Sequence, residues 1–159
     1  MFISRNTSSN TFKDGFTLVE LMIVMVVITL VAAIGSMSAL AARVQANEGI
    51  AKSSLKALVS AVEIYRNTIG VYPNDLATLG ESYIAPDLVA GQKSGYNFVL
   101  KSGNDGNTFT CTAVPVKINY TGNKSYCTAV LNTLYVYDNA PALSADGSTC
   151  PAGGSTLTG

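Results

Sequence analysis

A long stretch without charge is the feature that most restricts how this chain can fold. No charged residue lies between Glu20 and Arg43, and residues 16–34 are almost entirely apolar. A helix of roughly 20 apolar residues is long enough to cross a bilayer. We therefore expect residues 16–40 to form a membrane-spanning helix, outside any globular core.

The composition of the chain excludes several classes of function. The 159 residues include ten Lys plus Arg, ten Asp plus Glu and no His, so the net charge is zero. Without a basic cluster the chain has no electrostatic footprint for nucleic acid. Without His it cannot carry Ser–His or Cys–His catalysis or a His-based zinc site. We expect a protein that is not an enzyme and needs no cofactor.

The residues around the apolar stretch predict its orientation. Arg5 and Lys13 precede it, so the N-terminus should stay in the cytoplasm while everything after Arg43 is translocated. A cleaved secretory signal, cut near residues 39–41, and a plain single-pass anchor are the alternatives. Both leave Glu20 unexplained, because a carboxylate near the centre of a membrane helix costs about 2.5–3.5 kcal/mol.

Residues 15–24 read Gly-Phe-Thr-Leu-Val-Glu-Leu-Met-Ile-Val. This segment resembles the class III signal of type IV prepilins and of type II secretion pseudopilins. The resemblance implies that a prepilin peptidase cuts between Gly15 and Phe16 and methylates the new amino group of Phe16. It also implies that Glu20 is needed for assembly. The chain departs from the family at Asp14, where Lys or Arg is more common, and at residues 35–38, where many members have a kinking Pro.

The position of Glu20 also has a physical explanation. In a bundle of identical apolar helices, sliding one helix along another exchanges one apolar contact for another, so hydrophobicity does not fix the axial register. A buried carboxylate that faces the cationic amine of Phe16 in a neighbour does fix it, because any other register leaves a charge unpaired. We expect Glu20 to set the register between subunits.

The residues after the apolar stretch predict a continued helix that covers a folded domain. Apolar residues recur at three- and four-residue spacing from Leu55 to Ile69, with polar residues opposite them. We expect one helix from about Thr17 to residue 67, ended by Gly70 and Pro73. A short helical turn should follow at residues 74–79, capped by Asp75.

Strand signals occupy much of the remaining chain. Residues 96–101, 108–117, 125–130 and 133–137 have strand-like patterns and are separated by short turns. Consecutive strands with short connections form an antiparallel meander. The predicted fold class is α+β: a long N-terminal hydrophobic helix packed on an antiparallel sheet, as in the pilin fold. The segment after Asp138 should fold over the sheet or be poorly ordered.

These expectations divide the chain into three parts. Residues 1–15 form a cleaved leader. Residues 16–67 form the N-terminal helix, in which 16–40 is the transmembrane or filament-core part and 41–67 is an amphipathic spine. Residues 68–159 form the globular head with its C-terminal tail.

Three cysteines follow the apolar stretch, and in an oxidising compartment we expect one disulfide and one free thiol. Cys111 and Cys127 are predicted on neighbouring strands, but a turn centred near residues 120–121 would place Cys111 opposite Val130 and not opposite Cys127. We therefore favour Cys127–Cys150 slightly over Cys111–Cys127, and pilins often tie down a C-terminal loop in this way.

Other candidate sites have weaker support. Residues 104–107 are rich in oxygen ligands, but they lack the EF-hand pattern and fit a hairpin turn better than a metal site. We expect no metal site. Asn119 and Asn123 begin glycosylation sequons, which we leave unweighted because they often arise by chance.

The sequence as a whole predicts a filament subunit. We expect a type IV pilin that is held in the inner membrane as a single-pass prepilin and then packs with its own copies into an extracellular or periplasmic filament. Its partners would be the prepilin peptidase and an inner-membrane assembly platform with its ATPase. A pseudopilin of a type II secretion system is one alternative. A membrane-anchored periplasmic binding domain is another.

Overall fold

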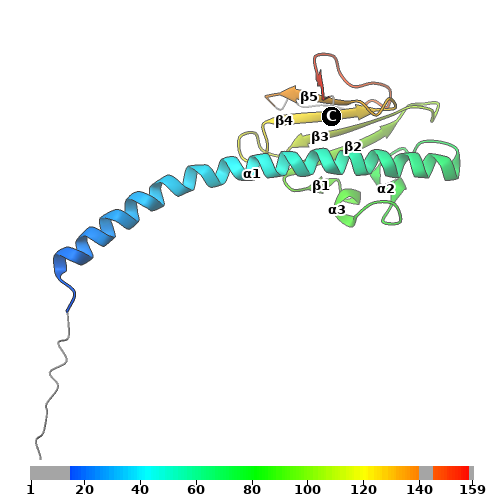
Figure 1. The fold of residues 1–159 in the computed structure, drawn as a ribbon. Coiled ribbons are helices and arrows are strands. Elements are labelled where there is room, and N and C mark those ends of the chain that lie inside the picture. The colour runs from blue at the N-terminus through cyan, green and yellow to red at the C-terminus, as the bar shows by residue number, and fades with distance from the viewer. Residues whose placement is uncertain (1–14, 140–144, 158–159) are drawn as a thin grey trace, which may run out of the picture. The chain divides into compact units, whose positions relative to one another are not determined.

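A computed structural model describes residues 15–139 and 145–157, without the side chains of residues 34–38 (Figure 1). Residues 1–14 of the predicted leader therefore lie outside the described residues. The side chains of residues 35–38, where many members of the family have a Pro, are also not described. The chain divides into two compact units, residues 1–38 and residues 39–159. Helix α1 covers Leu18–Ile69, which confirms the prediction of one continuous helix.

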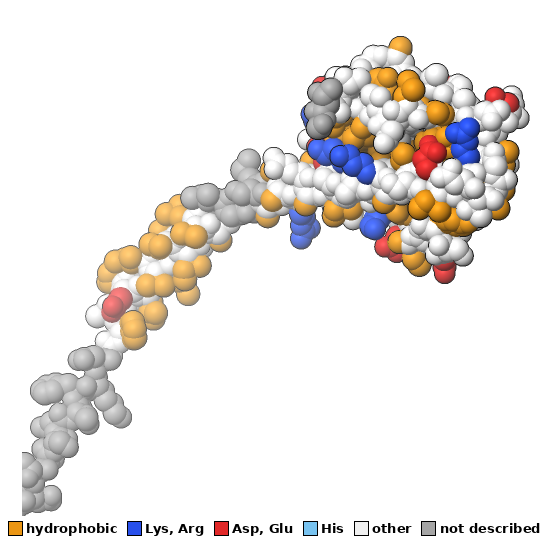
Figure 2. Space-filling view, turned by 45° about the vertical axis from the view of Figure 1, so that its right-hand side comes forward, with side chains coloured by type: hydrophobic (Ala, Val, Ile, Leu, Met, Phe, Trp, Pro, Cys, Tyr) orange, Lys and Arg blue, Asp and Glu red, His pale blue; other side chains and the backbone are white. Residues whose placement is uncertain are grey.

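The first unit contains the start of α1, and no residue that the structure describes covers it. Every described side chain from Gly15 to Ala33 is exposed. Figure 2 shows apolar side chains along the visible face of this helical segment. Among the helical residues whose side chains are described, no stretch meets the length and hydropathy needed to cross a membrane.

The second unit is built on the part of α1 that begins at residue 39. Leu55, Leu58 and Val62 are at most 1% exposed and face the sheet, as their spacing predicts. The predicted apolar face ends early, because Ile69 is 56% exposed. The helix stops at Gly70, whose φ of +97° suits glycine and whose N–H donates to the carbonyl of Arg66 at 2.7 Å.

Two short helices connect α1 to the sheet. Helix α2 covers Leu76–Leu79, and the side chain of Asp75 accepts a hydrogen bond from the backbone N–H of Thr78 at 2.7 Å. The predicted capped turn is thus confirmed. Helix α3 covers Pro86–Val89 and was not predicted; Pro86 stands in its first turn, where a missing N–H costs nothing.

The sheet is an antiparallel meander in which the spatial order of the strands is their order in the chain (Figure 1). Four strands correspond to predicted ones, and the two-residue edge strands β1 and β6 do not. The strands are β1 Gln92–Lys93, β2 Tyr96–Ser102, β3 Phe109–Pro115, β4 Lys124–Ala129, β5 Leu134–Asp138 and β6 Ser155–Thr156. The predicted α+β fold class is confirmed.

The two faces of the sheet have different contents. The face toward α1 carries the core, including Tyr96, Phe109 and Tyr126, each with no exposed area. The opposite face carries small polar residues of β3 and β4, such as the fully buried Thr110 and Thr112. The second face therefore also has a cover, and the C-terminal segment provides much of it.

The predicted pairing of β3 with β4 is wrong by two residues. Cys111 lies opposite Thr128 rather than Val130, and Thr112 lies opposite Cys127. The connection between these strands contains its own bridge, Ile118 to Gly122, so it is not a simple turn centred at residues 120–121. A shift of two residues keeps every side chain on its predicted face, because strand side chains alternate with period two.

Candidate functional site

The first turn of α1 is closed by Thr17. Its hydroxyl oxygen accepts a hydrogen bond from the backbone N–H of Glu20 at 3.2 Å, and its carbonyl accepts from the N–H of Leu21 at 3.2 Å. Thr17 is therefore the N-cap and Glu20 is the third helical residue. The spacing Thr-x-x-Glu is a capping-box pattern, a signal that the sequence analysis did not use.

Glu20 lies where the helix itself favours a negative charge. It is the acidic residue of the first turn of α1, and its side chain is exposed. The unpaired N–H groups of a helix N-terminus attract anions and stabilise them by about 0.3–1 kcal/mol. Among the described residues the only ion pair joins Lys124 to Asp138, so Glu20 has no ion-pair partner there.

The apolar side chains around Glu20 are not covered by any of the described residues. Phe16 is 77% exposed, Leu18 is 74% exposed and Met25 is 70% exposed. A contiguous apolar surface of this size is unusual on a soluble monomer and indicates contact with another protein or a lipid phase. Because the exposed residues occupy all sides of the helix, this surface requires more than one neighbour or a surrounding apolar medium.

Gly15 is not required by the packing of this chain. A Cβ atom added at this position would meet no atom of the described residues beyond its chain neighbours within 4 Å. Gly15 also precedes the helix, in a stretch without regular structure. The fold of the described residues therefore does not require a glycine at position 15.

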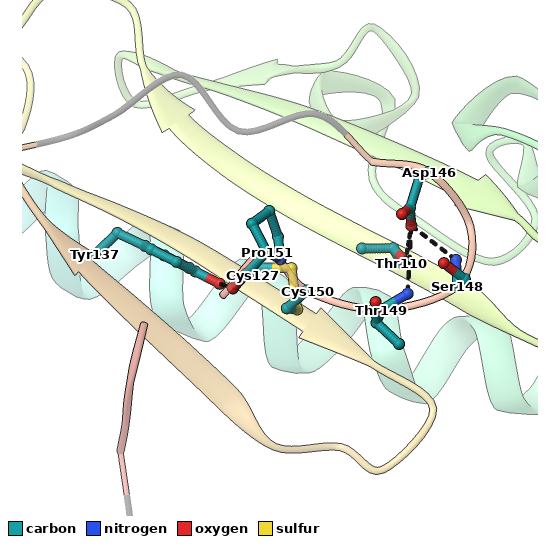
Figure 3. Close-up of a disulfide and its surroundings, with 8 residues drawn as sticks. All are labelled: Thr110, Cys127, Tyr137, Asp146, Ser148, Thr149, Cys150 and Pro151. Carbon is teal, nitrogen blue, oxygen red and sulfur yellow. Dashed lines mark hydrogen bonds between the residues drawn. A yellow bond between two sulfur atoms is a disulfide. The ribbon is translucent and has the colours of Figure 1, made fainter. Parts of the chain in front are cut away.

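The C-terminal segment is attached to the outer face of the sheet by a disulfide (Figure 3). Cys127 of β4 is bonded to Cys150, the pairing that the sequence analysis favoured. Cys111 could not replace Cys127, because it faces α1 from the other side of the sheet and belongs to the core. Nearby, the hydroxyl of Tyr137 donates to the carbonyl of Pro151.

A second anchor of the same segment is Asp146 (Figure 3). Its carboxylate accepts hydrogen bonds from the backbone N–H groups of Ser148 at 2.9 Å and Thr149 at 3.3 Å, and from the Thr110 hydroxyl at 3.4 Å. The Ser148 N–H is the main reason that the pKa of Asp146 lies below its ordinary value.

A cavity of about 380 Å³ lies beside the disulfide, but its lining offers little chemistry. The lining contains threonines, serine, Tyr135 and small apolar residues, without a carboxylate, a basic side chain or a free thiol. Within the described part of the chain, no group of three His, Cys, Asp or Glu residues could hold a metal ion. Asp105 forms the predicted turn, accepting from the backbone N–H of Asn107 at 3.1 Å.

The free thiol is Cys111. It is fully buried in the core, and burial raises its pKa to about 12. A thiol with so little thiolate is a poor nucleophile and a poor metal ligand.

The loop between β3 and β4 is held against α1 by contacts that the sequence did not reveal. The Asn47 side chain donates to the carbonyl of Thr121 at 3.1 Å, and the Glu48 carboxylate accepts from the N–H of Asn123 at 2.9 Å. Glu48 and Lys52 are four residues apart on α1, but they form no ion pair among the described residues. The Glu48 carboxylate instead accepts the hydrogen bond from the backbone N–H of Asn123 in the loop.

Comparison with known proteins agrees with the N-terminal site. Residues 12–36 match the family described as the prokaryotic N-terminal methylation motif. The fold and this segment together define an α+β protein whose N-terminal helix carries a methylation motif. More particularly, the motif supports a type IV pilin-like prepilin. The match describes the N-terminal segment alone, and the comparison with curated proteins finds no match.

Proposed function

We propose that the chain is a structural subunit of a type IV pilus or a pilus-like filament. The observation that carries the proposal is the first helical turn: a capped helix with an acidic third residue, inside a methylation motif and surrounded by uncovered apolar side chains. Subunits of this pilin-like class are structural and not catalytic. An uncovered apolar helix fits that role, because other subunits can bury it.

Maturation would proceed at the N-terminal edge of α1. The prepilin peptidase would cut between Gly15 and Phe16 and methylate the amino group of Phe16. The lack of any steric need for glycine at position 15 supports recognition of this residue by an outside protein. The inner-membrane assembly platform and its ATPase would then drive assembly.

Glu20 would pair with the amino group of Phe16 in a neighbouring subunit. Within one described chain Glu20 has no ion-pair partner, and its exposed position leaves it free to meet one. Cutting after Gly15 keeps Thr17 and therefore the cap of the helix. The cleaved chain would thus retain the geometry that presents the carboxylate.

Each segment of the chain would have its own role in the prepilin and in the filament. Residues 1–15 would be the leader, 16–40 the segment in the inner membrane and later in the filament core, 41–67 the spine, and 68–159 the head. The protein would begin as a single-pass prepilin and end in an extracellular or periplasmic filament. The head would determine the surface of the filament.

A pseudopilin of a type II secretion system fits the same motif. A pilus subunit should appear in surface fibres sheared from cells, and its loss should leave enzyme export intact. Loss of a pseudopilin should block export of a secreted enzyme. A membrane-anchored binding domain would show neither effect and would not be cut after Gly15.

The test uses two variants in the native host, with intact mass and sheared fibres as readouts. Gly15→Val should give an uncut prepilin without fibres. Glu20→Ala should give a cut and methylated chain that assembles poorly, because the register contact is lost. Glu20→Asp is the matched control that keeps the charge. Normal fibres from uncut Gly15→Val would overturn the processing step, and normal fibres from Glu20→Ala would overturn the role of Glu20.

A further inference from the structure

A groove lies between α1 and the β5–β6 edge of the sheet, within the second unit. It encloses about 720 Å³. Lys52 and Lys56 line it from the helix, and its lining contains no carboxylate. The other lining residues are Leu55, Val59, Ser60, Thr128, Asn132, Thr133, Leu134, Thr156 and Leu157.

The two lysines lie one helical turn apart and so point to the same side of α1. Lys52 is half-buried, with its Nζ atom 5.9 Å from the centre of the Tyr126 ring, and Lys56 is exposed. Neither forms an ion pair among the described residues. Glu48, the carboxylate one turn before Lys52, is already hydrogen-bonded to Asn123 and Tyr126.

Two like charges at this spacing repel each other. The groove therefore combines a positive charge, a hollow surface and nearby amide and hydroxyl groups. An anionic partner would relieve the repulsion between the lysines. A carboxylate matches this chemistry, because ammonium groups and carboxylates form charge-assisted hydrogen bonds.

The opposite edge of the sheet carries the complementary charge. Strand order places β1 at the far edge from β6, and α3 contacts β1. Residues 71–95 contain three acidic residues and one basic residue, Lys93. Asp75 caps α2, whereas Glu81 and Asp87 are exposed and have no ion pair among the described residues.

We infer that the groove receives Glu81 and Asp87 from a second copy of the chain. This inference rests on the proposed filament function and names a contact between heads that the N-terminal motif does not specify. The two surfaces differ and lie at opposite edges of the sheet, so one copy can bind the next in the same way. A contact between unlike surfaces propagates, and when the rotation does not close it builds a helical filament.

The charged contact between heads orients the subunits more than it holds them together. A single exposed ion pair contributes little to the free energy of binding and is screened by salt. Complementary charges mainly select the correct orientation, while like charges placed together oppose binding strongly. The contact therefore orients heads within an assembly whose cohesion comes from the apolar helices.

Charge reversal in the full chain, in the native host, tests the contact. Lys52→Glu with Lys56→Glu, and separately Glu81→Lys with Asp87→Lys, should each lower the amount of sheared filament about tenfold, since like charges then meet. All four changes together should restore it to within about twofold. Lys101→Glu with Lys117→Glu is the matched control, because it reverses two exposed lysines outside the groove and should leave filaments unchanged.

Crosslinking gives a readout that does not depend on yield. Lys56→Cys with Asp87→Cys, in a Cys111→Ser background, should form a ladder of covalent oligomers in oxidised filaments. Lys101→Cys with Asp87→Cys should not. Normal filaments from the reversed variants together with no ladder would overturn this inference while leaving the filament function intact. Absence of filaments from the unaltered chain would overturn the function itself.

Discussion

Thr17 links the geometry of the first helical turn to the charge of Glu20. The N-cap hydrogen bond fixes Glu20 as the third helical residue, close to the positive end of the helix. If the chain is cut after Gly15, the new ammonium group of Phe16 adds positive charge at the same end. Glu20 then offsets, within its own chain, a positive charge that this end of the helix disfavours.

Cys111 allows a prediction about thiol chemistry. Burial raises its pKa to about 12, so almost no reactive thiolate exists near neutral pH. We expect iodoacetamide at pH 8 to leave the folded chain unlabelled and to add one group after unfolding without reductant. Reduction should raise the number to three, which intact mass can measure. More than one adduct without reductant would contradict the Cys127–Cys150 pairing.

Asp146 gives a pH dependence with a definite sign. Its pKa is lowered, chiefly by the Ser148 N–H, so its ionised form stabilises the fold above the unfolded-state pKa. This stabilisation is lost as the pH falls through the folded-state pKa. Asp146→Asn should therefore lower the unfolding midpoint at pH 7, and the difference from the parent should shrink as the pH falls below about 4, the ordinary pKa of Asp.

The matched control for Asp146 is Asp87→Asn, which removes a carboxylate from an exposed site outside this hydrogen-bonded turn. Thermal unfolding of both variants across the pH range measures the effect. A difference between Asp146→Asn and the parent that is constant from pH 7 to pH 2 would show that the charge of Asp146 does not contribute.

At the scale of elements, the spine of α1 should supply much of the stability of the head. Leu58 has no exposed area and Ile64 is 56% exposed. Leu58→Ala should lower the free energy of unfolding by about 2–5 kcal/mol. Ile64→Ala, on the same helix, should change it by less than about 0.5 kcal/mol. Denaturant unfolding of the full chain in detergent gives both values, and equal effects would contradict the assigned face.

The sequence predicted the elements whose signals are local. The 3.6-residue spacing indicated the spine, Asp75 indicated the start of α2, and alternation indicated four strands. The strands β1 and β6 are two residues long, so alternation carries no signal for them, and they form because a neighbouring strand supplies hydrogen-bond partners. The β3–β4 register depends on the internal bridge of its loop, which no local pattern reveals.

The candidate site was predictable to a similar extent. The residues from Gly15 to Glu20 stand in one short motif, so the sequence alone names them as candidates. The contacts of Asn47 and Glu48 with the β3–β4 loop join residues more than 70 positions apart. Such contacts follow from the packing of the sheet on α1, and no local pattern in the sequence indicates them.

At the scale of the whole molecule, the two units should be separable. The first buried side chain along the described chain is Val44, and the core cluster begins at Ala51. A variant that lacks residues 1–38 should therefore keep its fold and disulfide and remain monomeric in water without detergent. Size-exclusion chromatography and cooperative thermal unfolding measure this outcome. Aggregation or non-cooperative unfolding would show that the head needs the apolar segment.

The meander order of the strands has a consequence for how the head forms. Each strand pairs with the one made just before it, so the sheet can grow one hairpin at a time along a spine that precedes all of it in the chain. Pairings between strands close in sequence cost little loop-closure entropy and form quickly. A chain threaded through a membrane from its N-terminal side could therefore fold as it emerges, and the bond between Cys127 and Cys150 would close only after five of the six strands are out.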